Sequence, residues 1–136
     1  RSDDDGRYHR HMTMNDVAPV APVGPGESGA LTAAACLCQG FSDVSRVTIV
    51  QHLLLGEHRV VDLTRHLGLA QSTVSRHLAC LLDCGIVTVR AQGRASVYAL
   101  AHPAATTALL QAAETLLGLT GDAVTLCPAA AAVRGS

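Results

Sequence analysis

Two short segments, 60–67 and 71–83, are separated by only three residues, and the first of these is Gly68. Each segment carries apolar residues three and four positions apart, so each is predicted to be a helix with one buried face. Glycine commonly ends a helix because it adopts the left-handed backbone conformation without strain. Two helices joined by so short a turn pack against each other, and the pair is therefore predicted to be a helix-turn-helix.

The segment after the second helix has the composition of a β-hairpin. Ile86–Val89 is rich in β-branched residues, which favour strands, and Gly85 before it ends the helix. Ala91–Arg94 predicts a turn, and Ala95–Leu100 predicts the returning strand. Two strands directly after a helix-turn-helix form a wing.

Three further helices are predicted, over Ala30–Gln39, over Val44–Leu55, and from Pro103 or Ala104 to Leu119. The first and last of them consist largely of Leu and Ala, and they have more apolar surface than so small a domain can cover by itself. We therefore expect a homodimer whose interface is built from the first and last helices. The expected fold class is mainly α (α+β), a winged helix-turn-helix.

The chain of 136 residues is long enough for one domain. Residues 1–11 are expected to be an added tag and residues 12–28, which contain Pro and Gly, a flexible arm. Residues 29–120 are expected to form the winged helix-turn-helix domain, and residues 121–136 a tail that carries Cys127. No signal peptide is recognisable, and no apolar run reaches the roughly 18 residues of a membrane span, so we expect a cytoplasmic protein with no membrane partner.

Positive charge is concentrated in the helix-turn-helix and the wing. The chain has a formal net charge of −1, but segment 46–94 holds six Arg against three acidic residues. Aromatic residues make up only 2% of the chain, too few for a platform on which single-stranded nucleic acid stacks. The local excess of cations therefore favours double-stranded DNA as the partner.

The residues expected to contact DNA are polar and lie at the start of the second helix and on the wing. The first turns of such a helix meet base edges and phosphates in the major groove, where Gln and Arg read bases and hydroxyls bind phosphates. No Ser/His/Asp or paired-carboxylate arrangement indicates a catalytic site, so we do not expect an enzyme. The predicted DNA-binding residues are Gln71, Ser72, Thr73, Ser75, Arg76, His77, Arg90, Gln92 and Arg94.

A pattern of polar, apolar and glycine residues runs through the second helix and the wing: Ser72-x-x-Ser75-x-His77-Leu78-x-x-Leu81, Gly85-Ile86-Val87, Gly93-Arg94 and Val97-Tyr98-x-Leu100. Over about residues 30–120, the chain resembles the ArsR/SmtB family of metal-sensing repressors in this pattern. The resemblance implies a dimeric winged helix-turn-helix that binds operator DNA and leaves it when an inducer binds.

Five cysteines are present, and two of them lie in the second helix. Cys80 and Cys84 are four residues apart, which puts both side chains on one face, and two thiolates there could share one soft metal ion. Cys127 could supply a third thiolate, whereas the alternative for Cys80 and Cys84 is that they are small apolar core residues. Cys36 and Cys38 point to nearly opposite sides of a helix, so we expect them to pack in the core or an interface, with one as an optional extra ligand.

Within the ArsR/SmtB family, segment 77–85 resembles the CmtR-type lead and cadmium sensors. That resemblance implies Cys80, Cys84 and Cys127 as ligands for Cd(II) or Pb(II), with the third cysteine supplied by the C-terminal tail of the other subunit. The sequence itself leaves open whether Cys127 binds within its own subunit or across the dimer, and the softness of thiolate ligands makes Zn(II) a further candidate. The predicted function is a repressor that binds operator DNA when metal-free and is released by such a metal. The alternative is a repressor of the same fold that senses oxidants or persulfides through pairing of Cys36 or Cys38 with another cysteine.

Overall fold

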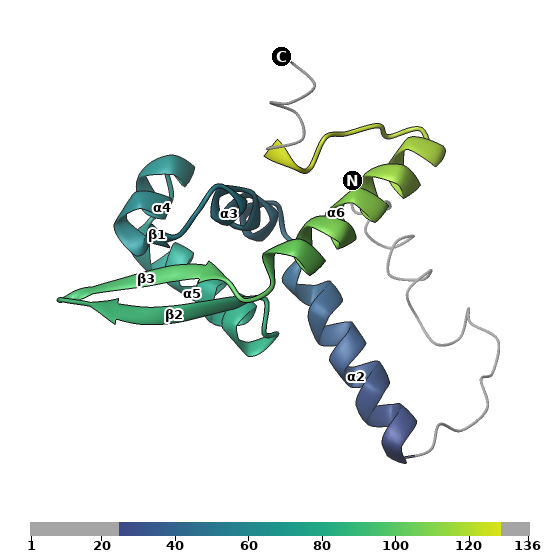
Figure 1. The fold of residues 1–136 in the computed structure, drawn as a ribbon, viewed down its shortest axis with the longest axis horizontal. Coiled ribbons are helices and arrows are strands. Elements are labelled where there is room, and N and C mark those ends of the chain that lie inside the picture. Colours follow the sequence, from purple (N-terminus) through teal and green to yellow (C-terminus); the bar gives the residue numbers. More distant parts are fainter. Residues whose placement is uncertain (1–24, 129–136) are drawn as a thin grey trace, which may run out of the picture. The chain divides into compact units, whose positions relative to one another are not determined.

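The computed structural model describes residues 25–128. The chain divides into two compact units, residues 1–31 and residues 32–136, so α2 crosses the boundary and its residues 32–40 belong to the second unit. The predicted tag and most of the predicted arm lie outside the described residues. Figure 1 shows the elements, which follow in the order α2 (Pro25–Gly40), α3 (Val44–Leu54), β1 (His58–Arg59), α4 (Val60–Leu67), α5 (Gln71–Asp83), β2 (Val87–Gln92), β3 (Ala95–Leu100) and α6 (Pro103–Leu119).

The predicted helix-turn-helix is confirmed as α4 and α5. Gly68 ends α4 with a φ of 67°, and its N–H donates to the Thr64 carbonyl at 2.9 Å. This left-handed residue lets the chain reverse within the three residues before Gln71 begins α5. The second helix thereby lies across the first, as the short turn predicts.

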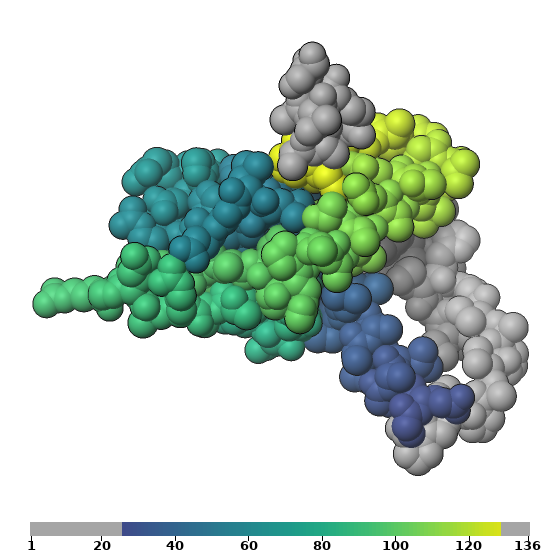
Figure 2. All heavy atoms as spheres, in the orientation of Figure 1, coloured from purple at the N-terminus to yellow at the C-terminus, as the bar shows by residue number. Residues whose placement is uncertain are grey.

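The wing is confirmed as the antiparallel hairpin β2–β3, whose green atoms lie at the lower left of the surface in Figure 2. Pairing runs from Val87 opposite Leu100 to Gln92 opposite Ala95, so the turn is only two residues long, shorter than predicted. Cross-strand hydrogen bonds continue through Ala91, whose low strand propensity they override. A third strand, β1, pairs with the outer side of β3 in the order β1–β3–β2.

The helix starts follow local capping rules. Asp43 caps α3, since its carboxylate accepts hydrogen bonds from the backbone N–H groups of Ser45 at 2.8 Å and Arg46 at 3.3 Å. The helix α2 begins at Pro25, five residues before the predicted start at Ala30. Proline is well suited to the first helical position because it lacks the N–H group that would have no partner there.

The core is built from aliphatic side chains of α3, α4, α5 and the wing. Because one face of α5 is fixed in this core, the opposite face of that helix turns to solvent. Six side chains have almost no exposed surface: Ile49, Val50, Leu63, Val74, Leu78 and Leu81.

The segment after α6 returns to the domain. The Leu126 carbonyl accepts a hydrogen bond from Gln51 of α3 at 3.0 Å, and the Cys127 N–H donates to Glu114 of α6 at 3.1 Å. Cys127 is consequently only 2% exposed. Among residues 25–128, no helix is both long enough and apolar enough to cross a membrane.

Candidate DNA-binding surface and metal centre

The polar residues at the start of α5 lie on the face opposite the core. Val74 and Leu78 are fully buried and fix the rotation of the helix. Among the predicted DNA contacts of this helix, Thr73 and His77 are half-buried. Four others are exposed, namely Gln71, Ser72, Ser75 and Arg76. The exposed four form a continuous polar strip that is accessible to a large ligand such as a DNA groove.

His77 contacts residues of its own chain. Its Nδ1 lies 3.2 Å from the Arg46 guanidinium, and its Nε2 lies 3.8 Å from an Asp43 oxygen. Since guanidinium only donates hydrogen bonds, Nδ1 accepts and the ring proton of neutral His77 is on Nε2, facing Asp43. Burial opposes ionisation of Asp43, but two backbone hydrogen bonds and the neighbouring cationic groups outweigh it and hold the pKa of Asp43 below its ordinary value.

Arg46 also joins α2 to the helix-turn-helix. Its guanidinium donates to the carbonyls of Gln39 at 3.0 Å and Gly40 at 3.2 Å, which are the last residues of α2. One side chain therefore connects the end of α2, the start of α3 and α5. We conclude that the Arg46 guanidinium stabilises contacts within the domain and is less available to DNA than an unpaired arginine.

The other arginines differ in whether an acidic partner neutralises them. Arg59 and Arg65 both lie near Asp62, at 3.3 and 3.7 Å, and Arg90 of the wing pairs with Glu57 at 2.5 Å. Two further arginines have no ion pair within the described part of the chain, Arg76 on α5 and Arg94 at the wing turn. These two are the cations most readily available to phosphates.

Three cysteine sulfurs gather where α2 meets the end of α5. The Sγ atoms of Cys36 and Cys84 are 2.6 Å apart, and the Cys84 thiol donates to the Cys36 carbonyl at 2.8 Å. Cys80 lies on the same face of α5 and interacts with the Cys84 side chain. Burial, followed by the proximity of Cys36 and then of Cys80, raises the pKa of Cys84 to about 12.

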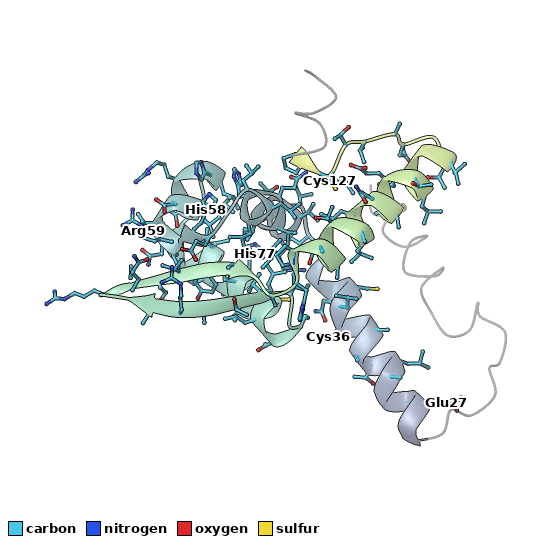
Figure 3. All side chains as sticks on the ribbon, in the orientation of Figure 1. Glu27, Cys36, His58, Arg59, His77 and Cys127 are labelled. Carbon is cyan, nitrogen blue, oxygen red and sulfur yellow. The ribbon has the colours of Figure 1, made fainter. Side chains whose placement is uncertain are left out.

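Cys127 and Cys38 lie elsewhere in the protomer. Cys127 is packed against α6, with its Sγ 3.9 Å from the Thr107 carbonyl, and Figure 3 shows it well apart from Cys36. Cys38 is exposed. Of the predicted ligands, the structure thus brings Cys80 and Cys84 together and adds Cys36, whereas it does not place Cys127 beside them within one chain.

The position of Cys36 could have been found from the sequence by helix periodicity. Cys36 and Gly40 are four residues apart and share one face of α2. Gly40 is buried, and a Cβ at that position would lie 2.5 Å from the end of the Ile86 side chain. A glycine that close to its neighbour marks the face of α2 that packs on the end of α5, and Cys36 lies on that face.

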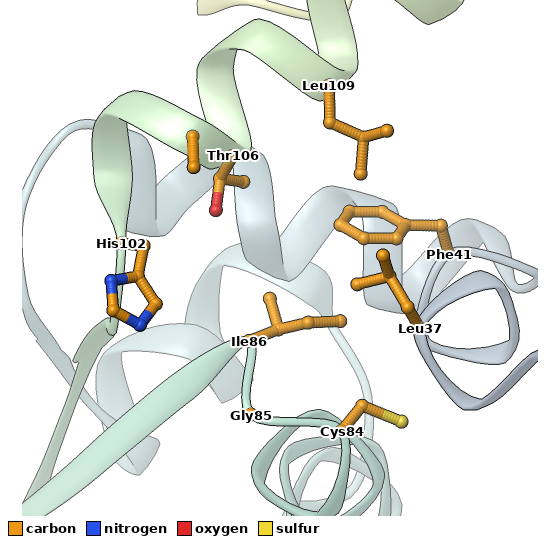
Figure 4. Close-up of a pocket in the computed structure, with 9 residues that line it drawn as sticks. Leu37, Phe41, Cys84, Gly85, Ile86, His102, Thr106 and Leu109 are labelled. Atoms are coloured by element: carbon orange, nitrogen blue, oxygen red, sulfur yellow. The ribbon is translucent and has the colours of Figure 1, made fainter. Parts of the chain in front are cut away.

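The surroundings of Cys84 are mostly apolar. Figure 4 shows its sulfur turned toward α2, which carries Leu37, and Phe41 follows directly after that helix. Together with Ile86, Thr106 and other residues, these side chains line a pocket of about 220 Å³. Low polarity beside a thiol disfavours the charged thiolate, consistent with the raised pKa of Cys84.

Comparison with known proteins places these features in one family. The sequence model of the bacterial regulatory protein arsR family matches residues 43–89. CmtR of Mycobacterium tuberculosis, an HTH-type transcriptional regulator, is 37% identical over 91 residues, which cover 67% of this chain and 77% of CmtR. A "Probable mercury resistance operon repressor" of Streptomyces lividans is 35% identical over 65 residues, 48% of this chain and 52% of that protein.

Solved structures agree. Mb0332 of Mycobacterium bovis, described as a homodimeric winged helix-turn-helix DNA-binding domain, has a TM-score of 0.62 and 26% identity, covering 73% of this chain and 95% of that one. HlyU of Vibrio cholerae has a TM-score of 0.54 and 31% identity, covering 60% of this chain and 90% of that one. From its winged helix-turn-helix fold and from the length and identity of its match to CmtR, we conclude that the chain belongs to the arsR family of bacterial regulatory proteins.

Proposed function

We propose that this chain is a homodimeric repressor that holds operator DNA when metal-free and leaves it when Cd(II) or Pb(II) binds its cysteines. The observation that carries the proposal is the cluster of Cys36, Cys80 and Cys84, because it joins α2 to the end of the helix expected to read DNA. The similarity to CmtR, an HTH-type transcriptional regulator, supports a function of this kind. We expect the protein to act in the cytoplasm, where its thiols stay reduced.

The donor set favours a soft metal ion. Thiolate sulfur prefers Cd(II), Pb(II) and Zn(II) over hard cations such as Mg(II). In a tetrahedral site with metal–sulfur bonds of about 2.3 Å or longer, the sulfurs are about 3.8 Å or more apart. A metal bound by both Cys36 and Cys84 fixes their sulfurs at about that separation.

Metal binding there would act on the DNA-binding surface. Cys84 follows directly after α5 and Cys36 lies on α2. A change in the distance between their sulfurs would therefore change the position of α5 relative to α2. Metal and DNA then oppose each other through a coupling free energy, typically about 1–3 kcal/mol, or roughly 5- to 150-fold in affinity. The third ligand is either Cys36 of the same chain or Cys127 of a second copy.

The experiment is a Cd(II) and Pb(II) titration that follows sulfur-to-metal charge-transfer absorption and operator binding together. The operator is a duplex selected from a random library, and DNA binding is read by fluorescence anisotropy. Three variants remove one candidate ligand each, Cys36→Ser, Cys80→Ser and Cys127→Ser. Cys38→Ser is the matched control, since Cys38 is an exposed cysteine on the same helix as Cys36.

Cys80→Ser should bind the operator normally and stay bound when Cd(II) is added, because one ligand on α5 is lost. Whichever of Cys36→Ser and Cys127→Ser weakens the absorption band identifies the third ligand. Cys38→Ser should behave like the unmodified protein. The proposed site is refuted if Cd(II) releases Cys80→Ser from DNA at the same Cd(II) concentration that releases the unmodified protein. It is also refuted if no charge-transfer band appears.

The homodimer is supported by exposed apolar side chains on α2 and α6. Leu109 is 41%, Leu116 63% and Leu119 81% exposed along α6. An apolar groove of about 370 Å³ runs between α2 and α6, lined among others by Leu37 and Leu117. In sedimentation experiments, Leu116→Glu should give monomers, whereas the control Leu55→Glu, also at a site 63% exposed but just after α3, should stay dimeric.

A second candidate function rests on the same contact. The 2.6 Å separation of the Cys36 and Cys84 sulfurs suits disulfide formation, in which hydrogen peroxide takes two electrons from the thiols, its O–O bond breaks, and two waters carry away the thiol protons. Cys84 is a poor nucleophile because its raised pKa keeps it protonated. Peroxide-induced release that a dithiol reverses and that Cys84→Ser abolishes would favour this function over metal sensing.

A further inference from the structure

Three histidines that are not among the predicted DNA-binding residues come together beside the helix-turn-helix. His52 lies in the last turn of α3, His58 in β1 and His66 in the last turn of α4. The loop between α3 and β1 turns at Gly56, whose φ of 141° strongly favours glycine. This turn brings His58 back toward the end of α3, and one ring nitrogen from each histidine lies within 4.8 Å of the others.

The rings are arranged around a common point and not as a simple stack. The His52 and His66 rings are nearly parallel with centroids 4.7 Å apart, and the His58 ring meets them edge-on, at 6.0 and 5.6 Å. In the part of the chain that the structure describes, none of the three has an ion pair with a carboxylate. Because no acidic partner holds these three imidazoles together, we expect another group to stabilise their arrangement.

A hydrogen bond prepares one of the rings for a cation. Nδ1 of His58 lies 2.8 Å from the Gly56 carbonyl, and because a carbonyl only accepts, Nδ1 carries the proton. The lone pair of neutral His58 is then on Nε2. Metal-binding histidines commonly make such a bond from the other nitrogen to a backbone carbonyl, which fixes the tautomer and the ring orientation.

The surroundings of His52 favour its neutral form. Burial, followed by the neighbouring His66 and His58 rings, lowers the pKa of His52. A neutral imidazole keeps the lone pair that a cation needs. His66 is exposed, so an ion can reach the cluster from solvent and keep a water as a fourth ligand.

We propose that His52, His58 and His66 form a second metal site, which binds a borderline divalent cation such as Zn(II). Imidazole nitrogen suits Zn(II) and Co(II), whereas thiolate sulfur favours softer ions. Zinc–nitrogen bonds of about 2.0–2.1 Å set the nitrogens about 3.3 Å apart in a tetrahedron, so rotation of the side chains must draw them closer by up to about 1.5 Å.

The location of the three residues defines what the ion does. It ties the end of α3 to β1 and to the end of α4, which is the scaffold on which α5 rests. None of the three residues lies on α5 or on the β2–β3 hairpin. The ion therefore stabilises the folded domain, in contrast to the cysteine site, which acts on the position of α5.

The test measures Co(II) absorption and Zn(II)-dependent thermal stability in a Cys80→Ser background that also carries His9→Gln and His11→Gln. These changes weaken the thiolate site and remove two histidines outside the described residues. His66→Gln removes one exposed ligand. His102→Gln is the control, because His102 is an exposed histidine elsewhere in the domain.

The background protein should bind one Co(II) with weak visible bands and no sulfur charge transfer. Zn(II) at about 100 times its Kd should raise its Tm by more than about 10 °C. Both effects should disappear in His66→Gln and persist in His102→Gln, and His58→Gln should repeat the loss. If His66→Gln and His58→Gln bind and are stabilised like the control, or if the background protein binds no Co(II), the proposal is wrong.

Discussion

Arg76 and Arg94 should account for a measurable share of the salt dependence of DNA binding. Both are exposed, and neither has an ion pair within residues 25–128. Arg65 is equally a cation of the helix-turn-helix and its side chain is 70% exposed, but Asp62 lies 3.7 Å from it. A phosphate must displace that carboxylate to gain the same contact, so we expect Arg65 to contribute less.

The expected magnitude follows from counterion release. Each phosphate contact contributes about 0.9 to the slope of log affinity against log salt concentration. In the proposed dimer each arginine occurs twice, so Arg76→Gln and Arg94→Gln should each reduce the slope by about 1.8. Over a fourfold rise in salt, a slope change of about 1.8 corresponds to roughly tenfold less loss of affinity. The double variant should show about twice the change in slope.

The assay is fluorescence anisotropy with a selected operator and with an unrelated duplex, from about 50 to 400 mM KCl. Arg65→Gln is the matched control, because it removes one cation of the same type that is already neutralised. Loss of a phosphate contact weakens both duplexes alike, whereas loss of a base contact weakens only the operator. If Arg65→Gln lowers the slope as much as Arg76→Gln, or if the double variant leaves the slope unchanged, the assignment from ion pairing is refuted.

Three further predictions concern the fold and the thiols. In metal-free protein at pH 8, Cys38 should be alkylated much faster than Cys84, whose pKa near 12 keeps it protonated; equal rates by mass spectrometry would contradict this. Leu78→Ala should lower the free energy of unfolding by about 2–5 kcal/mol in urea followed by circular dichroism, and a loss below about 1 kcal/mol would show that Leu78 is not in the core. Gly68→Ala should lower it by about 1–2 kcal/mol because of the left-handed backbone, while Gly118→Ala, in regular helix with open space around it, should not lower it.

The parts of the fold that depend on neighbouring residues could be predicted. The turn at Gly68 and the hairpin around Gly93 follow from local backbone preferences, and both are confirmed. The strand β1 could not be predicted, since two residues carry no pattern and become a strand only through pairing with Val97 and Tyr98. The start of α2 at Pro25 differs from the predicted start at Ala30, because proline and glycine are typical of flexible segments, although proline also suits the first position of a helix.

In the candidate sites, too, local spacing could be predicted from the sequence, whereas contacts between distant residues could not. The i, i+4 spacing of Cys80 and Cys84 predicts a shared face from one helix alone, and the structure brings the two together. The contact of Cys36 with Cys84 joins residues 48 positions apart. The i, i+4 spacing of Cys36 and Gly40 predicts only that they share one face of α2, and the structure shows that this face meets the end of α5. Cys127, expected as a ligand, is buried against α6 in one protomer, so its predicted role depends on a second copy.

The exposed leucines of α6 have a consequence for gene dosage. In the proposed dimer a second chain covers Leu116 and Leu119, so the amount of complete repressor would depend on how much of the chain the cell makes. Well below the dimer Kd, operator occupancy falls with the square of the chain's concentration, and single chains expose an apolar surface of the kind that chaperones and proteases recognise. If the proposed repressor acts in this way, a cell with too few copies would lose repression without any metal present.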